Sequence, residues 1–261
     1  MKRYLLRQEK LIRHARTMRY LLMLGPWRAA VIKWYQWLGN TPLPTESRSH
    51  FSDLDVAESI GELNDQGYAA GFHLAGEAVE QIMNYCRANG DGEHINPHLT
   101  CDEVRQVAHD PKIVAVVKNY LGTEPIIYRS HMYWVRPQAD QAQNNYVTHF
   151  HYDVGDFKCL LVFIYLTDVD EESFPHMVIA GTHKNRSLRK IFTRMLSETT
   201  AREQYGDRIK LITGRRGATF FEDVTCYHKR TGGHKPRLVL QITYVLHRNP
   251  ETAFKHHGDR R

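Results

Sequence analysis

Residues 148–153 of this 261-residue chain read Thr-His-Phe-His-Tyr-Asp and carry its most informative pattern. In an extended strand, side chains two positions apart point to the same face, so His151 and Asp153 are expected to lie close enough to hold one ion. An imidazole and a carboxylate together suit a borderline divalent metal ion. The stretch therefore predicts a metal site on a β-strand, to which a second histidine would add a third ligand.

The spacing His-x-Asp alone is weak, because it arises about once by chance in a chain of this composition. A second copy, His257-Gly258-Asp259, lies in the charged C-terminal tail, where nothing around it resembles a strand. The first copy is more significant, because a later segment supplies a second histidine for the same site. Residues 217–228, Gly-Ala-Thr-Phe-Phe-Glu-Asp-Val-Thr-Cys-Tyr-His, read as a strand and turn that end on His228.

Arg237 begins another apolar strand nine residues after His228. A buried guanidinium is costly without an anion, and a dicarboxylate could supply one by bidentate pairing. Two histidines and one carboxylate form the facial triad of non-haem iron enzymes, which leaves coordination positions open. This set, with one anchoring arginine, is the minimum that a 2-oxoglutarate-dependent oxygenase needs.

Three other histidines are weaker candidates for the metal site. His149 shares a strand face with His151 but has no aspartate two residues on. His234 stands only three residues before Arg237, which would crowd two roles onto one turn. His183 follows a glycine turn and is expected to be a structural hydrogen-bonding group.

The pattern of apolar residues changes near residue 125. Before it, helical spacing predicts helices over 54–67, 75–88 and 102–121, the last restarting at Pro111, with an extended stretch at 68–74. After it, one helical pattern spans 186–204, and short β-branched and aromatic runs predict strands at 126–135, 146–153, 157–167, 176–181, 210–213, 217–222 and 236–247. Helices followed by many short strands predict an α+β fold, a sandwich or barrel with helices on one side.

Several motifs follow one another in order along residues 55–248. They are Gly-Glu-Leu-Asn-Asp-Gln-Gly-Tyr at 61–68, Tyr-Leu-Gly-Thr-Glu-Pro at 120–125, the His-x-Asp strand, Phe-Ile-Tyr-Leu-Thr-Asp-Val-Asp at 163–170, Pro-His-Met-Val-Ile-Ala-Gly-Thr-His-Lys at 175–184, and 217–228 followed by Arg237. In type and order they resemble the motifs of the phytanoyl-CoA dioxygenase-like family of Fe(II)/2-oxoglutarate-dependent oxygenases.

This resemblance implies a double-stranded β-helix, a jelly-roll or cupin-like core with N-terminal helices packed on one side. It implies that His151, Asp153 and His228 hold Fe(II) as the catalytic metal ligands. It also implies that Arg237 binds the cosubstrate 2-oxoglutarate, with dioxygen as the second cosubstrate. Because related halogenases lack the carboxylate that Asp153 supplies, the resemblance further implies hydroxylation of an unactivated C–H bond in a small-molecule, lipid or lipid-linked substrate.

Four further side chains are expected around the substrate: His131, Tyr133, Lys158 and Thr182. His131 and Tyr133 alternate on a predicted strand that faces the barrel. Each fits equally well as a residue of the substrate pocket or as a hydrogen-bonded polar group of the core. A different class of function also stays open, because a fold does not determine a function. The alternative is a non-catalytic jelly-roll module that binds a metal or another ligand.

Residues 1–40 form a basic extension that lies outside the resemblance, and residues 41–261 form the predicted oxygenase domain. Residues 1–38 carry nine Lys or Arg and one Glu, a net charge of +8, so the other 223 residues sum to −2 of the overall +6. Apolar residues recur at helical spacing in two runs, Leu11, Ala15, Met18 and Leu22, then Trp27, Val31, Trp34 and Leu38. A helical hairpin packed on the body or another subunit, an interfacial helix on an anionic membrane, and a targeting peptide all fit this pattern.

Composition excludes other classes of protein. Hydrophobic residues make up 42 % and charged residues 25 %, which is typical of a globular chain and not of a collagen-like or disordered one. The four cysteines are dispersed without a Cys-x-x-Cys pair, which favours a reducing cytoplasm, with peripheral membrane contact as an addition, over a disulfide scaffold or zinc ribbon. Because the excess positive charge belongs to the extension, no nucleic-acid partner is expected for the body.

Overall fold

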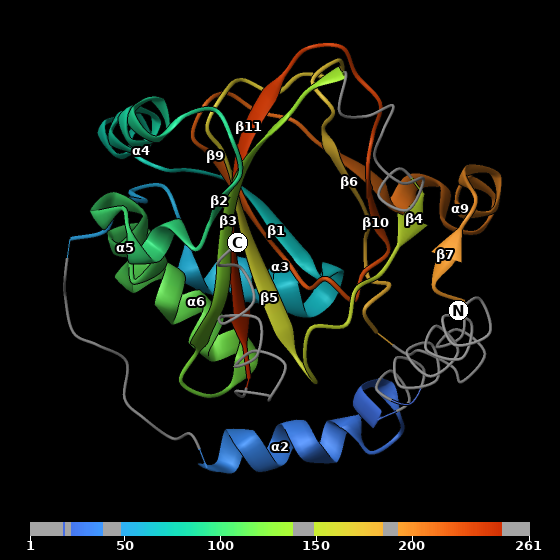
Figure 1. Cartoon of the computed structure of the whole chain (residues 1–261). Helices are drawn as coiled ribbons and strands as arrows, with labels where there is room; N and C mark the ends of the chain where they lie inside the picture. Colours follow the sequence, from blue (N-terminus) through green and yellow to red (C-terminus); the bar gives the residue numbers. More distant parts are fainter. Residues whose placement is uncertain (1–17, 19–21, 39–47, 138–148, 185–192, 247–261) are drawn as a thin grey trace, which may run out of the picture.

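Two antiparallel sheets pack face to face in the computed structural model, which describes residues 18, 22–38, 48–137, 149–184 and 193–246 (Figure 1). The six-stranded sheet has the order β1-β9-β5-β11-β3-β2, from strands β1 (Tyr68–His73), β9 (Ala218–Glu222), β5 (Cys159–Tyr165), β11 (Arg237–Val245), β3 (Ile126–Val135) and β2 (His94–Ile95). The five-stranded sheet has the order β7-β4-β10-β6-β8, from β7 (Met195–Leu196), β4 (Phe150–His151), β10 (His228–Arg230), β6 (His176–Ile179) and β8 (Ile209–Ile212).

Alternation along the central strands separates two hydrophobic clusters. On β5, Val162 and Ile164 face the helices, whereas Phe163 and Tyr165 face the five-stranded sheet. Side chains of both sheets meet in the second cluster, as Phe163 and Val178 do. The molecule is therefore an α+β protein with a jelly-roll core. The six-stranded sheet is covered on one face by helices and on the other by the five-stranded sheet.

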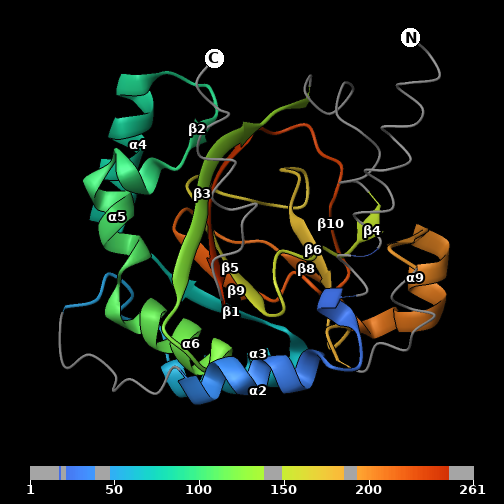
Figure 2. The same cartoon turned by 60° about the horizontal axis from the view of Figure 1, so that its bottom comes forward.

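Four helices cover the outer face of the six-stranded sheet (Figure 2). They are α3 (Val56–Gln66), α4 (Gly76–Asn89), α5 (Asp102–Ala108) and α6 (Pro111–Leu121). The predicted restart at Pro111 is confirmed, because Asp110 caps α6 and separates it from α5. Short 3₁₀ turns at Pro97–Leu99 and Gly206–Arg208 complete the connections, and α9 (Glu198–Tyr205) lies beside the five-stranded sheet (Figure 1).

Gly67 ends α3 and brings this helix against the turn that follows β9. Its φ of 79° is left-handed, a conformation that favours glycine, and its N–H donates to the Leu63 carbonyl. A Cβ at this position would lie 2.4 Å from Cys226 Sγ and from His183 Nδ1. The Gly67 carbonyl accepts a hydrogen bond from the Asp223 N–H at 2.8 Å. A glycine here therefore lets the helical layer support the turn after β9.

The second predicted helix of the extension is present as α2 (Arg28–Leu38), which runs along one end of the molecule (Figures 1 and 2). Its apolar contacts with the body include Ile32 and Tyr35, which pack on the main core. Trp27 and Trp34, which belong to the predicted apolar stripe, are 45 % and 59 % exposed. Of the alternatives open for this stripe, packing on the body is therefore not what the two tryptophans do. Most of the first predicted helix lies outside the described residues.

The predicted strand at 146–153 and the predicted helix at 186–204 differ from the structure within the described residues. Strand β4 contains only Phe150 and His151, so Asp153 follows the strand instead of lying in it. Met195 and Leu196, expected in the helix, pair with β4 as strand β7, and the helix begins only after Ser197 caps it. Pairing with an available strand edge outweighs the helical preference of Met195 and Leu196.

None of the helices in the described ranges is long and apolar enough to cross a membrane. All four cysteines lie in the described part of the chain, where they are buried and unpaired.

Replacing Asp110 should destabilise the fold strongly. Its carboxylate is buried and accepts hydrogen bonds from the Ser49 hydroxyl and from the N–H groups of His50 and Lys112. We expect Asp110→Ala to lower the free energy of unfolding by about 2–4 kcal/mol, because a helix cap is lost and buried donors lose their acceptor. Asp102→Ala is the matched control, since its exposed pair with Arg105 contributes about 0.5 kcal/mol. Equal losses in urea unfolding would contradict this account.

Candidate metal centre

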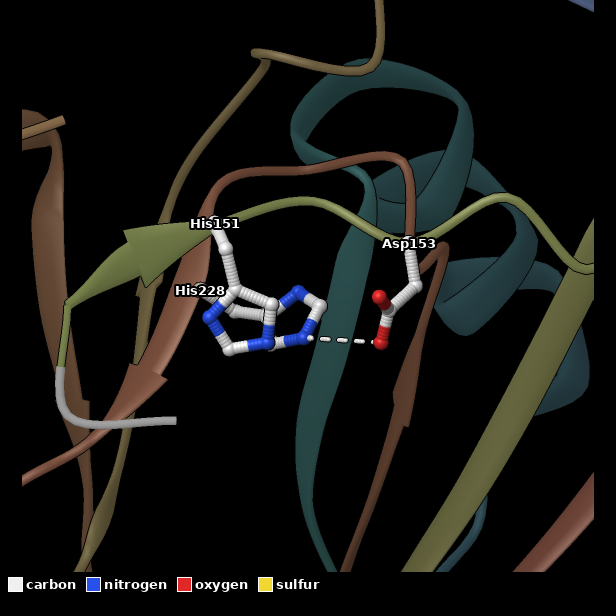
Figure 3. A group of neighbouring side chains, drawn as sticks. All are labelled: His151, Asp153 and His228. Atoms are coloured by element: carbon white, nitrogen blue, oxygen red, sulfur yellow. Dashed lines mark ion pairs between the residues drawn. The ribbon is translucent and has the colours of Figure 1, made fainter. Parts of the chain in front are cut away.

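His151, Asp153 and His228 converge on one point from two separate segments (Figure 3). His151 ends β4, and His228 begins β10 directly opposite it in the antiparallel register. Asp153 lies two residues past His151, where its N–H donates to the Val224 carbonyl at 2.8 Å. One ligand atom from each of the three side chains lies within 4.8 Å of the others. This spacing is compatible with a single divalent ion bound by all three.

The three side chains differ in exposure. His151 and His228 are buried, and their ring centroids are 4.5 Å apart with the rings at 61°. Half of the Asp153 side chain is exposed, and its Oδ2 lies 3.8 Å from Nε2 of His228. The site is therefore closed on the side of the two imidazoles and open on the side of the carboxylate.

Hydrogen bonds at Nδ1 orient both imidazoles. Nδ1 of His151 lies 2.8 Å from the His149 carbonyl. Nδ1 of His228 lies 3.1 Å from the Cys226 carbonyl, which accepts its hydrogen bond, while Oε1 of Glu222 lies 3.2 Å away at ion-pair distance without hydrogen-bond geometry. An imidazole that donates from Nδ1 presents Nε2 as its basic nitrogen, which is the atom that would bind a metal.

Burial lowers the pKa of both histidines. For His151 the burial is partly offset by the charge of Asp153, and for His228 by the charge of Glu222. Neutral imidazole is the form that binds a metal, so the lowered pKa values favour metal binding at and below neutral pH.

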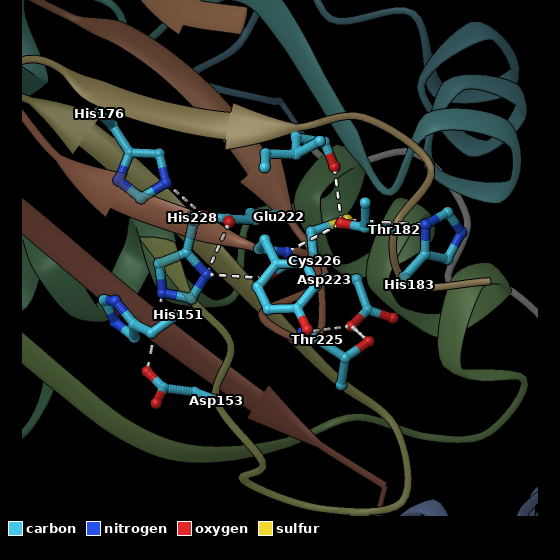
Figure 4. A network of polar contacts seen from close by, with 12 residues as sticks. His151, Asp153, His176, Thr182, His183, Glu222, Asp223, Thr225, Cys226 and His228 are labelled. Carbon is cyan, nitrogen blue, oxygen red and sulfur yellow. Dashed lines mark hydrogen bonds and ion pairs between the residues drawn. The ribbon is translucent and has the colours of Figure 1, made fainter. Parts of the chain in front are cut away.

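A buried carboxylate, Glu222, joins His228 to a third histidine, His176 (Figure 4). Its Oε2 lies 2.8 Å from Nε2 of His176, and the side chain has no exposed surface. Burial raises the pKa of Glu222 to about 7. Burial, together with the nearby positive charge of Arg237, lowers the pKa of His176 to about 3. The group that supports His228 therefore carries less negative charge than an ordinary glutamate.

Our sequence reasoning missed both of these residues. Glu222 lies two positions after Phe220 on β9, and Phe220 faces the space between the sheets. Alternation along the predicted strand at 217–222 would thus have placed a carboxylate inside the barrel. His176 had no comparable signal, because its partner comes from a strand 46 residues away.

The turn between β9 and β10 aims His228, and Asp223 builds that turn (Figure 4). Its Oδ1 accepts from the Thr225 N–H at 2.9 Å and from the Thr225 hydroxyl at 2.6 Å. Its Oδ2 accepts from the Tyr120 hydroxyl at 2.6 Å. Burial alone would raise the pKa of Asp223, but the charges of Arg28 and His183 and these hydrogen bonds outweigh it and lower the pKa.

The metal-site residues open into a cavity of about 330 Å³ that also contains Arg237. Arg237 is buried, and its Cζ lies 5.2 Å from the centroid of the Tyr165 ring. Its Nε and Nη1 have no hydrogen-bond partner among the described residues. A buried guanidinium with two unsatisfied donors is suited to an anion that enters the cavity, and the distal carboxylate of a dicarboxylic acid has the matching geometry.

Two of the four predicted substrate residues line this cavity and two do not. His131 stacks on Tyr133 at 4.3 Å, and the Tyr133 hydroxyl accepts from Gln241 Nε2 at 2.9 Å; all three line the cavity. Lys158 lies elsewhere, with its ammonium over the Tyr120 ring and bonded to the Tyr120 carbonyl. Thr182 is occupied structurally, because its hydroxyl donates to the Ile179 carbonyl and accepts from the Tyr227 N–H.

The rival histidines lie outside the cavity lining. His234 is 67 % exposed and faces Glu172. His183 Nδ1 lies 3.6 Å from Cys226 Sγ beside Gly67, so it supports the turn before His228. The His149 side chain is exposed, and its carbonyl orients His151.

Solved structures of three proteins are similar to this chain over most of its length. The epimerase SnoN from nogalamycin biosynthesis, described as non-heme and alpha ketoglutarate dependent, is 16 % identical; the match covers 72 % of this chain and 80 % of SnoN, with a TM-score of 0.53. EctD from S. alaskensis with bound Fe is 15 % identical, over 79 % of this chain and 82 % of EctD, with a TM-score of 0.54. HygX from Streptomyces hygroscopicus with nickel and 2-oxoglutarate bound is 14 % identical, over 72 % and 85 %, with a TM-score of 0.53.

These likenesses establish the fold, a jelly roll of the kind found in 2-oxoglutarate-dependent enzymes. No family model and no curated protein sequence matches the chain.

Loss of a predicted metal ligand should remove metal binding without removing the fold. We expect Ni²⁺ or Co²⁺ to raise the melting temperature of the wild-type protein, because an ion bound only by the folded state stabilises it. His228→Ala and Asp153→Ala should lose this increase. His234→Ala is the matched control and should keep it. An equal metal-induced increase in all three variants would exclude the assigned site.

Replacing Glu222 should weaken metal binding through His228. Outer partners that contact and orient a metal ligand typically contribute 10- to 100-fold to metal affinity, and Glu222 contacts His228 at ion-pair distance. Because the Cys226 carbonyl still accepts from His228, we expect Glu222→Leu to lower Co²⁺ affinity by about tenfold, the low end of that range. The exposed Glu172→Leu is the control. Unchanged affinity in Glu222→Leu, measured by spectroscopic titration, would show that Glu222 does not position the histidine.

Proposed function

We propose that this protein is a non-haem Fe(II)/2-oxoglutarate-dependent oxygenase. The observation that carries the proposal is the shared cavity, in which His151, Asp153 and His228 lie with a buried, unsatisfied Arg237. The similar structures include proteins described as alpha ketoglutarate dependent or as binding Fe, which supports the same class.

The donor set fits a ferrous ion and leaves room for exchangeable ligands. Two neutral imidazoles and one carboxylate occupy three positions, so the opposite face stays available to cosubstrates. With 2-oxoglutarate and dioxygen, bound iron would supply the oxidising chemistry that hydroxylates an unactivated C–H bond. The chain itself contributes the orientation of His228 through Glu222 and the orientation of His151 through a backbone carbonyl.

Arg237 is the proposed anchor for the distal carboxylate of 2-oxoglutarate. Its charge attracts a dicarboxylate, and the high pKa of Glu222, which is buried behind the cavity wall, limits the opposing negative charge near the cavity. His176, whose low pKa keeps it neutral at pH 7, adds no charge of its own. The cavity is therefore electrostatically suited to an anionic cosubstrate beside the metal.

Hydroxylation of a small-molecule, lipid or lipid-linked substrate is the proposed reaction. Asp153 provides a carboxylate ligand in the position that related halogenases leave without one, which favours hydroxylation. His131, Tyr133 and Gln241 offer polar groups along the cavity wall for orienting a substrate. A non-catalytic module would have no need for a three-ligand site beside a buried cation, so we favour the enzyme over that alternative.

Anaerobic addition of Fe(II) and 2-oxoglutarate tests the proposal directly. We expect a visible charge-transfer band in the wild-type protein and none in Asp153→Ala. Arg237→Gln should weaken 2-oxoglutarate binding at least tenfold, because a charge-assisted bidentate pair is lost. Arg215→Gln, at an exposed site, is the matched control and should bind normally. A wild-type protein that binds the metal but shows no band and forms no succinate in air would contradict the proposal.

A further inference from the structure

Helix α2 is fixed to the body by one of its faces. Besides the packing of Ile32 and Tyr35, Gln36 Nε2 donates to the Leu121 carbonyl at 3.2 Å. Arg28 Nε donates to the Phe157 carbonyl at 2.6 Å. At 100° per residue these side chains occupy a single face of the helix. The orientation of α2 is therefore set, and its opposite face points outward.

That opposite face carries large apolar side chains. Trp27, Trp34 and Trp37 are 45 %, 59 % and 73 % exposed, and they fall within about 80° of one another on the helical wheel. Just before α2, Met18 and Leu22 are 65 % and 56 % exposed. We call the three tryptophan side chains the tryptophan face. Together with Met18 and Leu22 they make up five of the nine exposed large apolar side chains in the part of the chain that the structure describes.

The charge of the same segment indicates what this face meets. Residues 1–38 have a net charge of +8, whereas the rest of the chain sums to −2. Lys33 is exposed beside the tryptophan face, within about 40° of Trp37 on the wheel. Tryptophan prefers the boundary between lipid headgroups and acyl chains, and basic side chains next to it are attracted to anionic headgroups.

We propose that the tryptophan face docks the protein onto an anionic lipid bilayer. At 11 residues α2 is about 16 Å long, which is too short to span the roughly 30 Å hydrocarbon layer but sufficient to lie along its surface. An amphipathic helix with tryptophans on one face and a basic flank binds membranes in this orientation. The proposal is independent of the metal centre and its chemistry.

The segment that carries the tryptophan face packs against the elements that hold the predicted metal ligands. Met23 and Leu24, directly before α2, are buried in one cluster with Phe150 and Tyr152, which flank His151. Arg28, the first residue of α2, lowers the pKa of Asp223, the residue that builds the turn before His228. The surface-bound helix and the metal-bearing strands therefore form one packed unit, which would hold the catalytic domain at the membrane.

Flotation of the full chain with lipid vesicles tests the proposal. We expect binding to vesicles of phosphatidylcholine with 30 % phosphatidylserine, and weaker binding to phosphatidylcholine alone or in high salt. Trp34→Ala/Trp37→Ala should bind the anionic vesicles at least tenfold more weakly, because two interfacial anchors are removed. Lys33→Gln should weaken binding about fivefold. Leu99→Ala/Leu211→Ala, which removes exposed apolar side chains elsewhere, is the matched control and should bind like the wild type.

Two further measurements distinguish loss of membrane contact from loss of folding. An unchanged melting temperature shows that the tryptophan variant is folded, and brominated lipids should quench wild-type tryptophan fluorescence but quench the variant much less. Absence of flotation of the wild type, or equal flotation of the wild type and the tryptophan variant, would overturn the proposal. A wild-type dimer that becomes monomeric in the variant, without loss of vesicle binding, would instead assign the face to a second copy of the chain.

Discussion

The antiparallel pairing of β4 with β10 is the constraint on which the rest of the site depends. It places His151 opposite His228, two residues that are 77 positions apart in the chain, with their ring centroids 4.5 Å apart. The same strand β10 pairs with β6 on its other side, so its position is fixed from both edges. Asp153 then completes the set from the loop that follows β4, held by its backbone bond to Val224.

The helices that cover the six-stranded sheet support this pairing. The turn that leads into β10 is built by Asp223, which Tyr120 on α6 and the Gly67 carbonyl after α3 both hold in place. Glu222, the residue before it, keeps the His228 ring in its orientation from inside the barrel. The helical layer thus does more than cover the sheet, because it hydrogen-bonds the turn that positions His228, a predicted metal ligand. Burying Glu222, His176 and Arg237 together costs stability, which is typical of functional sites.

The sequence predicted the long apolar elements well, since their patterns determine their structure locally. Strand β3 matches its predicted range of 126–135, and α3 ends at Gly67 as its spacing indicated. The three predicted metal ligands are brought together, although Asp153 lies beyond the strand. Strand β10, His-Lys-Arg, was not predicted, because a three-residue polar strand is recognisable only from its neighbours. The outward face of α2 and the positions of Lys158 and Thr182 likewise depend on tertiary contacts that no local pattern encodes.

Anomalous diffraction from crystals grown with Mn²⁺ and 2-oxoglutarate would locate the metal and the diacid in one experiment. We expect one strong peak within coordination distance of Nε2 of His151, Nε2 of His228 and a carboxylate oxygen of Asp153, with the distal carboxylate of 2-oxoglutarate on Arg237. A peak bound by other residues, or a diacid bound away from Arg237, would contradict this expectation.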